Sequence, residues 1–236
     1  MLRGGAFSTV DIVTTETVDW LVHERELLDR GEVVVGIDEV GRGALAGPLV
    51  VGAVVVTGHA VPPESLNDSK LLTPLVREEL VEPLEHWAAD WSLGSVSAAE
   101  IDAWGLRLAL AVAATRALDG LRVRPSVALV DGSFNLLRAP IDVAFGVEHP
   151  PKLSYRSMST TTIVKGDRCC ASIAAASVLA KVHRDRVMTD LGRDFADYGW
   201  SSNKGYGAKA HMEAIRRLGQ TDHHRHSWQL PEQTAC

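Results

Sequence analysis

The sequence has few of the features that mark membrane proteins, secreted proteins or disulfide-stabilised scaffolds. No apolar run approaches the ~20 residues of a membrane-spanning helix, and the segment MLRGGAFSTVDIV lacks the apolar core of a secretory signal. Cysteine occurs three times, at the adjacent positions Cys169 and Cys170 and at position 236. This number and spacing fit neither a disulfide framework nor a metal-binding cysteine motif, so we expect a cytoplasmic protein.

Positive charge is also scarce when it is averaged over the chain. The 236 residues contain 24 Lys and Arg against 30 Asp and Glu, which gives a net charge of −6. Residues 165–217, however, hold ten Lys and Arg and six Asp and Glu. This asymmetry is compatible with a basic, nucleic-acid-binding face on an otherwise acidic protein.

Short β-branched runs alternate with longer segments of helical periodicity, which predicts an α/β fold. The expected strands cover residues 32–38, 48–57, 91–97, 126–132 and 160–167, and the expected helices cover 18–30, 73–89, 98–118, 172–191 and 208–218. Short connections join the first three strands, which predicts an antiparallel meander. Crossovers reach the last two strands, which should therefore run parallel to the first.

The most informative segment is VVVGIDEVGRG, residues 33–43. A buried strand leads into two adjacent carboxylates, Asp38 and Glu39, and then into a Gly-Arg-Gly turn. An unpaired carboxylate in a low-dielectric site costs several kcal/mol or more. The pair therefore predicts a compensating divalent cation, and the glycines around Arg42 suit a phosphate.

Two further expected strands also lead to a carboxylate, Asp131 in VDG and Asp167 in KGD. The carboxyl ends of parallel strands meet at the edge of the sheet where ligands bind. Four converging carboxylates repel one another unless cations lie between them. Two divalent ions about 3.5–4 Å apart activate a water and stabilise the leaving oxygen of a phosphodiester. The sequence thus predicts Asp38, Glu39, Asp131 and Asp167 as catalytic metal ligands.

Groups suited to a polyanion accompany these acids along the chain. Ser69 and Lys70 lie in a polar loop, and Lys165 precedes the last acid. In the segment NKGYG, Lys204 lies close to Tyr206, whose ring is suited to packing against a nucleotide. As a set, these residues predict a nucleic-acid substrate.

The combination of DEVGRG, NDSK, VDG, KGD, SIAAASVLAKVHRDRVM and NKGYG resembles ribonuclease HII, the type 2 ribonuclease H, from about residue 31 to 228. The resemblance implies a ribonuclease H-like fold, a five-stranded mixed sheet flanked by helices, with a helical C-terminal part. We expect an N-terminal extension and lead-in helix in residues 1–30 and the catalytic domain in 31–200. Residues 201–236 should add a substrate-contacting loop and helix to the same domain.

Position by position, the resemblance also implies roles for individual residues. The family's catalytic acids fall on Asp38, Glu39, Asp131 and Asp167, its ribose-reading turn on Gly41, Arg42 and Gly43, its substrate-contacting tyrosine on Tyr206, and its phosphate contacts on Ser69 and Lys70. Asn203 and Ala208 depart from the family, which often has histidine and threonine there. Segment 138–158 is longer than the family usually needs, and we assign it no function.

The activity implied by the resemblance is endonucleolytic and uses Mg²⁺ or Mn²⁺. It hydrolyses the RNA strand of RNA–DNA hybrids and nicks on the 5′ side of ribonucleotides embedded in duplex DNA, leaving 3′-hydroxyl and 5′-phosphate ends. Such an enzyme serves ribonucleotide excision repair and DNA replication. We expect a monomer whose partners are these nucleic acids, without a membrane.

Four other interpretations remain open at this point. GRGALAG could belong to a nucleotide-binding module, although its G-x-G-x-x-x-G spacing is one residue longer than the dinucleotide fingerprint and no GK[ST] follows. Another nuclease or strand-transferase on the same fold would use similar acids. Ribonuclease HIII would need an N-terminal domain larger than the roughly 30 residues before the first strand. A catalytically inactive hybrid-binding protein would not need all four acids.

Three further patterns are interpreted as structural. The histidines of HHRHSW, residues 223–228, fit no closed zinc spacing, and the family resemblance extends over this segment. Asp185, in HRDR, is expected to form a helix salt bridge. Cys169 and Cys170 are expected to be a small buried pair at a helix start.

Overall fold

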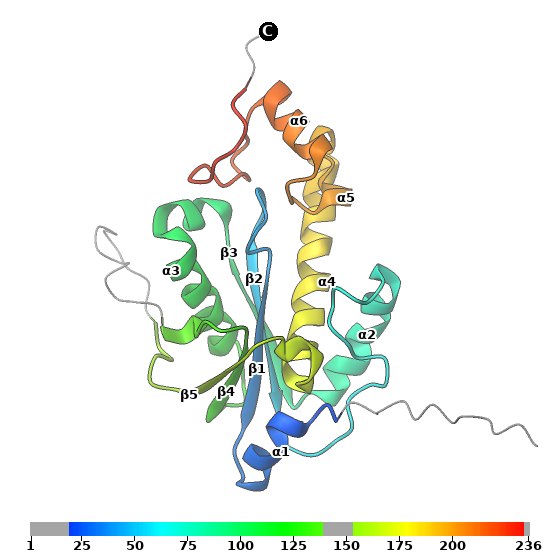
Figure 1. Cartoon of the computed structure of the whole chain (residues 1–236), viewed down its shortest axis with the longest axis vertical. Helices are drawn as coiled ribbons and strands as arrows, with labels where there is room; N and C mark the ends of the chain where they lie inside the picture. Colours follow the sequence, from blue (N-terminus) through cyan, green and yellow to red (C-terminus); the bar gives the residue numbers. More distant parts are fainter. Residues whose placement is uncertain (1–18, 139–152, 234–236) are drawn as a thin grey trace, which may run out of the picture.

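The computed structural model describes residues 19–138 and 153–233. A five-stranded mixed sheet in the order β3-β2-β1-β4-β5 forms its centre (Figure 1). The strands are β1 (Val34–Val40), β2 (Leu49–Val56), β3 (Asp90–Val96), β4 (Val127–Asp131) and β5 (Ser159–Ile163). The first three form an antiparallel meander, and β4 and β5 run parallel to β1. The predicted fold class and strand directions are therefore confirmed.

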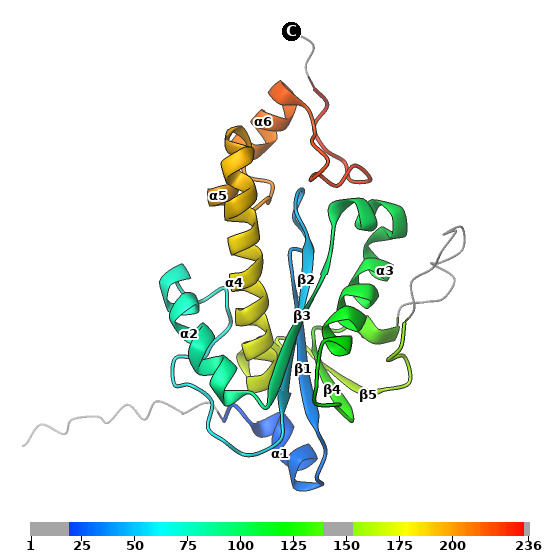
Figure 2. The ribbon, with the colours of Figure 1, turned by 180° about the vertical axis from the view of Figure 1, so that it is seen from behind.

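The described helices cover both faces and one end of the sheet. They are α1 (Val22–Asp29), α2 (Pro74–Trp87), α3 (Ala98–Asp119), α4 (Ala171–Asp194), α5 (Trp200–Asn203) and α6 (Lys209–Leu218). Helix α3 lies on one face, and α4 with α2 lies on the other (Figures 1 and 2). The helices α5 and α6 and the C-terminal segment gather near the turn between β1 and β2. None of the described helices has the length and apolarity to cross a membrane.

The central strands are buried on both faces. Every residue of β2 is buried, because Val51 and Val55 pack in the cluster that includes α3 while Val54 packs in the cluster that includes α4. A strand covered on both sides has no solvent-facing positions, so its sequence is a continuous β-branched run. The sequence LVVGAVVV shows this pattern directly.

Local signals place the helix boundaries where the sequence predicts them. The Thr73 hydroxyl accepts a backbone N–H of the first turn of α2, and Ser97 with Glu100 forms a reciprocal capping box at the start of α3. Gly105 has φ 72° and ψ 158°, so it interrupts α3 as expected.

Strand β1 begins and ends two residues later than predicted, and its antiparallel pairing with β2 continues to Val40, which lies opposite Val50. Asp38 and Glu39 therefore lie inside the strand, among its last three residues, and do not follow it. The sequence placed the boundary too early because carboxylates are disfavoured in strands. Pairing with β2 outweighs that preference.

The region around the last acid also differs from the prediction. Strand β5 ends at Ile163, so Asp167 lies in a 3₁₀ turn, Gly166–Arg168, just before α4. The following Cys170 is buried as expected, but Cys169 is partly exposed, which corrects the predicted buried pair. Most of segment 138–158 lies outside the described residues.

Helix α4 lies unusually close to the centre of the sheet. A Cβ on Gly36 of β1 would be 2.2 Å from the carbonyl carbon of Ser172 and 2.4 Å from the backbone nitrogen of Ile173. Both atoms belong to the backbone of α4, so the obstacle is not a flexible side chain. Glycine at position 36 is what allows the helix and the strand to touch.

We therefore expect Gly36→Ala to lower the free energy of unfolding by about 1–3 kcal/mol, the usual cost of overpacking, or by more if α4 cannot shift. Urea denaturation measures this loss. Gly58→Ala is the matched control, because a Cβ there meets nothing within 4 Å. Equal stabilities for the two variants would show that α4 moves freely on the sheet.

Candidate active site

The four predicted acids come from three elements that meet at one edge of the sheet. Asp38 and Glu39 lie near the end of β1, and Asp131 is the last residue of β4, which is the parallel neighbour of β1. Asp167 lies in the turn before α4. The charge of Asp131 acts on Asp38, Glu39 and Asp167, so the structure brings the four acids together as predicted.

Asp38 is the most strongly perturbed acid of the group. Burial, with only 4% of the residue exposed, and the charges of Glu39 and Asp131 raise its pKa to about 8. The Ser177 hydroxyl and the backbone N–H of Glu39, 2.8 Å from Oδ1, partly offset this rise. Without additional positive charge, this carboxyl group is largely protonated at neutral pH.

Basic side chains contact Glu39 and Asp167, and a backbone N–H group contacts Asp131. Burial raises the pKa of Glu39, and the Arg42 guanidinium, 3.5 Å from its carboxylate, opposes that rise. Burial also raises the pKa of Asp167, against the influence of Lys70. Asp131 Oδ1 accepts the backbone N–H of Gly166 at 2.8 Å, which ties β4 to the turn that carries Asp167.

Lys70 brings positive charge into this acidic group. Its Nζ lies 3.2 Å from Asp167 Oδ2 and 4.0 Å from Asp68 Oδ1. Burial alone would lower the pKa of Lys70, but Asp167, Asp38 and Asp68 outweigh it and raise the pKa. The Lys70 ammonium group therefore stays positively charged beside the acids.

Ser69 faces the protein interior. It is 4% exposed, and its Oγ lies 2.8 Å from Oγ of Ser177 in α4. Since Ser177 also hydrogen-bonds to Asp38, the hydroxyl of Ser69 is connected to the acidic group through α4. The phosphate contact implied for Ser69 stays a prediction.

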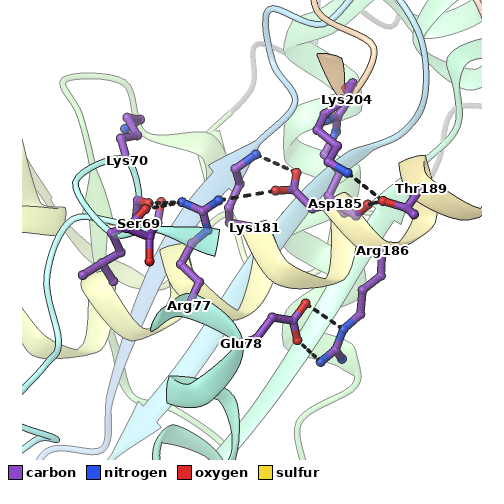
Figure 3. Close-up of polar contacts among 12 residues, drawn as sticks. Ser69, Lys70, Arg77, Glu78, Lys181, Asp185, Arg186, Thr189 and Lys204 are labelled. Atoms are coloured by element: carbon purple, nitrogen blue, oxygen red, sulfur yellow. Dashed lines mark hydrogen bonds and ion pairs between the residues drawn. The ribbon is translucent and has the colours of Figure 1, made fainter. Parts of the chain in front are cut away.

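Arg77 of α2 holds the loop that carries Ser69 and Lys70 (Figure 3). Its Nη1 donates to the carbonyl oxygens of Ser69 and Leu72, both at 2.7 Å. Its Nη2 lies 3.7 Å from Asp185 of α4. Asp185 also pairs with Lys181 at 2.6 Å, so the predicted helix salt bridge is confirmed.

Two pockets lie near these residues, and the smaller one adjoins the acids. A pocket of ≈ 200 Å³ is lined by Glu39, Arg42, Asp131 and Phe134, among others. A pocket of ≈ 640 Å³ lies between α2, α4 and α5, but none of the four acids lines it. Most charges around the larger pocket are paired with one another, as Arg186 is with Glu78, and Lys204 bonds to Thr189 (Figure 3). The smaller pocket is therefore the one relevant to the acids.

The Gly41-Arg42-Gly43 turn directly follows β1 and begins the connection to β2. Gly41 has φ 85°, and a Cβ there would be 2.2 Å from Nε of Arg184, so a side chain is excluded on both grounds. Because GRGALAG joins two antiparallel strands and opens no helix, it lacks the helix N-terminus of a dinucleotide-binding loop. This removes the nucleotide-binding alternative.

Tyr206 lies in a tight loop beside that turn. The preceding Lys204 and Gly205 both have positive φ, 53° and 80°. The Gly205 carbonyl oxygen accepts the backbone N–H of Leu45 at 2.8 Å and that of Ala46 at 3.2 Å. The structure thus fixes the predicted tyrosine loop to Leu45 and Ala46, which follow the predicted ribose-reading turn.

Two fully buried histidines form a chain of hydrogen bonds behind Tyr206. His224 Nδ1 accepts the backbone N–H of Thr221 at 3.0 Å, so its Nε2 carries the proton and donates to His211 Nε2 at 3.2 Å. That nitrogen also accepts Nε1–H of Trp200 at 3.0 Å. His211 Nδ1–H therefore donates to the Tyr206 carbonyl oxygen at 2.8 Å. Both rings are neutral, and the arrangement agrees with a structural interpretation of HHRHSW.

The sequence reasoning did not single out three residues that contact the site: Ser177, Arg184 and Arg225. Ser177 and Arg184 are seven positions apart in α4 and therefore lie on one face of the helix. Arg225 lies in HHRHSW, where the histidines drew attention away from it. The sequence did contain one signal for Arg184: it lies on the same face of α4 as small, buried residues, which indicates that its side chain is buried too.

The donor chemistry of the site fits a hard divalent cation. Carboxylate oxygens are the ligands that Mg²⁺ and Mn²⁺ prefer, and burial together with the neighbouring acids raises the pKa of Asp38, a rise that a cation would oppose. Within residues 19–138 and 153–233, however, no three His, Cys, Asp or Glu side chains stand close enough together to hold a metal as they are. A metal would require the carboxylates to turn toward it and Asp167 to exchange its contact with Lys70.

The buried histidines predict acid sensitivity. Burial and the nearby His211 lower the pKa of His224 to about 4, and burial lowers the pKa of His211. The unfolded chain, with histidine near 6.5, binds these protons first. The stability contribution is thus complete above pH 6.5 and is lost as pH falls toward 4, by up to about 3 kcal/mol for His224.

Urea unfolding at pH 7, 5.5 and 4.5 measures this loss. His224→Gln should be less stable at pH 7 but should lose less stability on acidification than the wild type. The exposed His86, changed to Gln, is the control. If both variants follow the wild-type pH profile, the buried pair does not cause the acid sensitivity.

Comparison with known proteins gives a consistent result. A family model described as Ribonuclease HII matches residues 35–231. Ribonuclease HII of Streptomyces griseus subsp. griseus is 46% identical over 198 residues, which cover 83% of this chain and 76% of the relative.

Two solved structures extend the comparison to the fold. Ribonuclease HII from the PCNA:RNase HII complex of Archaeoglobus fulgidus has a TM-score of 0.65 at 26% identity, covering 86% of this chain and 98% of that one. Bst-RNase HIII in complex with Mn²⁺ has a TM-score of 0.63 at 21% identity, covering 84% and 68% of the two chains. The second likeness is one of fold alone.

Proposed function

The chain belongs to the ribonuclease HII family of metal-dependent endoribonucleases, and from this membership we propose that it hydrolyses the RNA strand of RNA–DNA hybrids and nicks duplex DNA on the 5′ side of an embedded ribonucleotide. One observation carries the proposal: the four acids lie at one sheet edge beside the Gly41-Arg42-Gly43 turn, and Leu45 and Ala46, which follow that turn, bond to the loop of Tyr206. The products would be a 3′-hydroxyl and a 5′-phosphate.

We propose that Asp38, Glu39, Asp131 and Asp167 hold two divalent cations, Mg²⁺ or Mn²⁺. These ions, when bound, would supply activation of a water and stabilisation of the leaving oxygen. The raised pKa values of Asp38, Glu39 and Asp167 support this assignment, because a nearby positive charge returns such groups to their ionised form.

The remaining residues would bind and orient the nucleic acid. The backbone N–H groups of the Gly-Arg-Gly turn and the hydroxyl of Tyr206 would contact the ribose 2′-hydroxyl, the group that separates RNA from DNA at a given position. Lys70, whose side chain is 72% exposed at its position beside Asp167, would contact a phosphate near the cut. Ser69, next to Lys70 in the same loop, would contribute a second phosphate contact.

The wider role follows from the substrates. An enzyme that nicks beside single ribonucleotides would act in ribonucleotide excision repair, and one that removes RNA from hybrids would act during DNA replication. We propose a cytoplasmic monomer, whose division at residues 30 and 200 stays a prediction. The assembly of the Archaeoglobus fulgidus ribonuclease HII with PCNA belongs to that protein.

The test is cleavage of a DNA duplex that carries one ribonucleotide, in Mg²⁺ or Mn²⁺, against the same duplex made entirely of DNA. We expect the wild type to cut on the 5′ side of the ribonucleotide and to leave the all-DNA duplex intact. Asp131→Asn keeps the shape of the side chain and removes its charge, so its rate should fall by at least about 10²-fold.

Circular dichroism and thermal melting of Asp131→Asn provide the control for folding. An intact single-ribonucleotide duplex after incubation with folded wild type and either metal would refute the proposed activity. A folded Asp131→Asn protein with nearly wild-type turnover would refute the role of Asp131 alone.

Lys70→Ala should weaken substrate binding to a similar degree for different base sequences, because a phosphate contact carries no sequence information. The slope of log K against log salt concentration should become shallower by about one unit. Arg30→Ala is the matched control, since Arg30 is an exposed cation just after α1. Identical slopes for the two variants would place Lys70 outside the phosphate contacts.

A further inference from the structure

Two arginines near the ribose-reading turn are fully buried. Arg184 belongs to α4 and Arg225 to the segment 223–228, and both are 0% exposed. Neither forms an ion pair with a carboxylate in the part of the chain that the structure describes. Burying a charge is costly unless hydrogen bonds compensate. The partners that compensate for it here are backbone carbonyl groups.

Arg225 holds the turn between β1 and β2 from the C-terminal side. Its Nη2 donates to the carbonyl oxygen of Gly41 at 2.6 Å, and its Nη1 donates to that of Arg42 at 2.8 Å. A longer contact of 3.4 Å joins Nη2 to the carbonyl oxygen of Gly47. One guanidinium therefore fixes the first part of the turn and its far end.

Arg184 also bonds to the turn between β1 and β2, and it joins this turn to the loop of Tyr206. Its Nε donates to the carbonyl oxygen of Pro48 at 2.8 Å and its Nη2 to that of Ala46 at 3.1 Å. Its Nη1 donates to the carbonyl oxygen of Lys204 at 2.9 Å. The guanidinium also lies 5.2 Å from the ring centre of Tyr206, within the range of a cation–π contact.

Hydrogen bonds to α3 and to Leu45 hold the segment that carries Arg225. Asp102, near the start of α3, accepts the backbone N–H groups of His226 and Ser227, each at 2.9 Å. The backbone N–H of Arg225 donates to the Leu45 carbonyl oxygen at 2.9 Å. The position of Arg225 is thus fixed independently of any substrate.

The chemistry of these contacts requires arginine. A planar guanidinium presents five donors in a fixed fork, whereas a lysine ammonium presents a compact point charge on a flexible stem. Burial and the Arg184 charge lower the pKa of Arg225 to about 10, which leaves the guanidinium charged at neutral pH. Each arginine bonds three carbonyl groups from segments that a single lysine nitrogen would not reach together.

We propose that Arg184 and Arg225 are positioning residues that fix the Gly41-Arg42-Gly43 turn relative to Tyr206, and that this spacing sets how well the enzyme uses a single ribose beside the cut. The inference rests on the proposed function. Neither arginine touches the substrate, since both are buried. They act through the turn and through the tyrosine that they hold.

The expected consequence is a change in substrate preference. In a continuous RNA–DNA hybrid, neighbouring riboses help to position the strand, whereas a duplex with one ribonucleotide depends on a single ribose at the turn. Misplacement of reacting groups by about 1 Å costs up to about 10²-fold in rate. Loosening the turn should therefore harm the single-ribonucleotide substrate more.

The experiment compares kcat/KM on the two substrates for Arg184→Lys and Arg225→Lys, below the melting temperature of each variant. We expect the ratio of single-ribonucleotide to hybrid kcat/KM to fall by about tenfold. Arg77→Lys is the matched control, because Arg77 is also a nearly buried arginine that holds loop carbonyls, but those of Ser69 and Leu72. It should lower activity on both substrates alike.

A second measurement separates positioning from a general loss of structure. In a Tyr206→Ala background, Arg184→Lys should change the substrate ratio less than it does in the wild type, because the group through which it acts is gone. If a lysine variant is unfolded, Asp102→Ala tests the same link by releasing residues 226–227. Its expected effect is a smaller fall of the ratio in the same direction.

Proportionate losses on both substrates by Arg184→Lys and Arg225→Lys would overturn the proposal and leave a purely structural role. An unchanged ratio for Asp102→Ala, where that variant replaces an unfolded one, would do the same. Wild-type protein that cuts neither substrate would overturn the proposed function, a result seen before any variant is made.

Discussion

The direct contact between the backbone of α4 and the central strands is the constraint on which the rest of the structure depends. Gly36 and Gly52 leave no room for a Cβ, so at these two positions the backbone of the helix lies directly against the strands. This closeness lets Ser177 reach Asp38 and lets Arg184 reach the turn between β1 and β2. A helix held one side-chain layer further out would make neither contact.

The same closeness creates the electrostatic character of the site. Covering the end of β1 with α4 buries Asp38 and raises its pKa. Burial likewise raises the pKa of Glu39 and of Asp167, which Lys70 already approaches. The packing of α4 on β1 therefore also explains why a cation would stabilise the ionised form of Asp38. This agrees with the metal dependence of the family.

Much of the fold follows from local sequence, because runs of β-branched residues and N-cap residues such as Thr73 and Ser97 act within a few positions. The positions of Asp38, Glu39 and Asp131 were predictable for the same reason, since each lies at the end of a recognisable strand, whereas Asp167 lies in a turn after β5. The extension of β1 past Asp38 was not predictable, because it depends on pairing with β2 and not on the preferences of the residues themselves. Arg184 was not predicted either: a charged residue in a helix suggests exposure unless its carbonyl partners, far away in sequence, are known.

The histidines of HHRHSW could suggest a zinc site, although the structure gives them a structural role. Each nitrogen of His211 and His224 is already engaged by Thr221, Trp200, Tyr206 or the other ring, so neither ring has a lone pair left for zinc. The histidines hold the carbonyl of Tyr206, while Arg225 holds the carbonyls of the opposing turn. The motif therefore stabilises both sides of the proposed ribose-reading site through its two buried residues, His224 and Arg225.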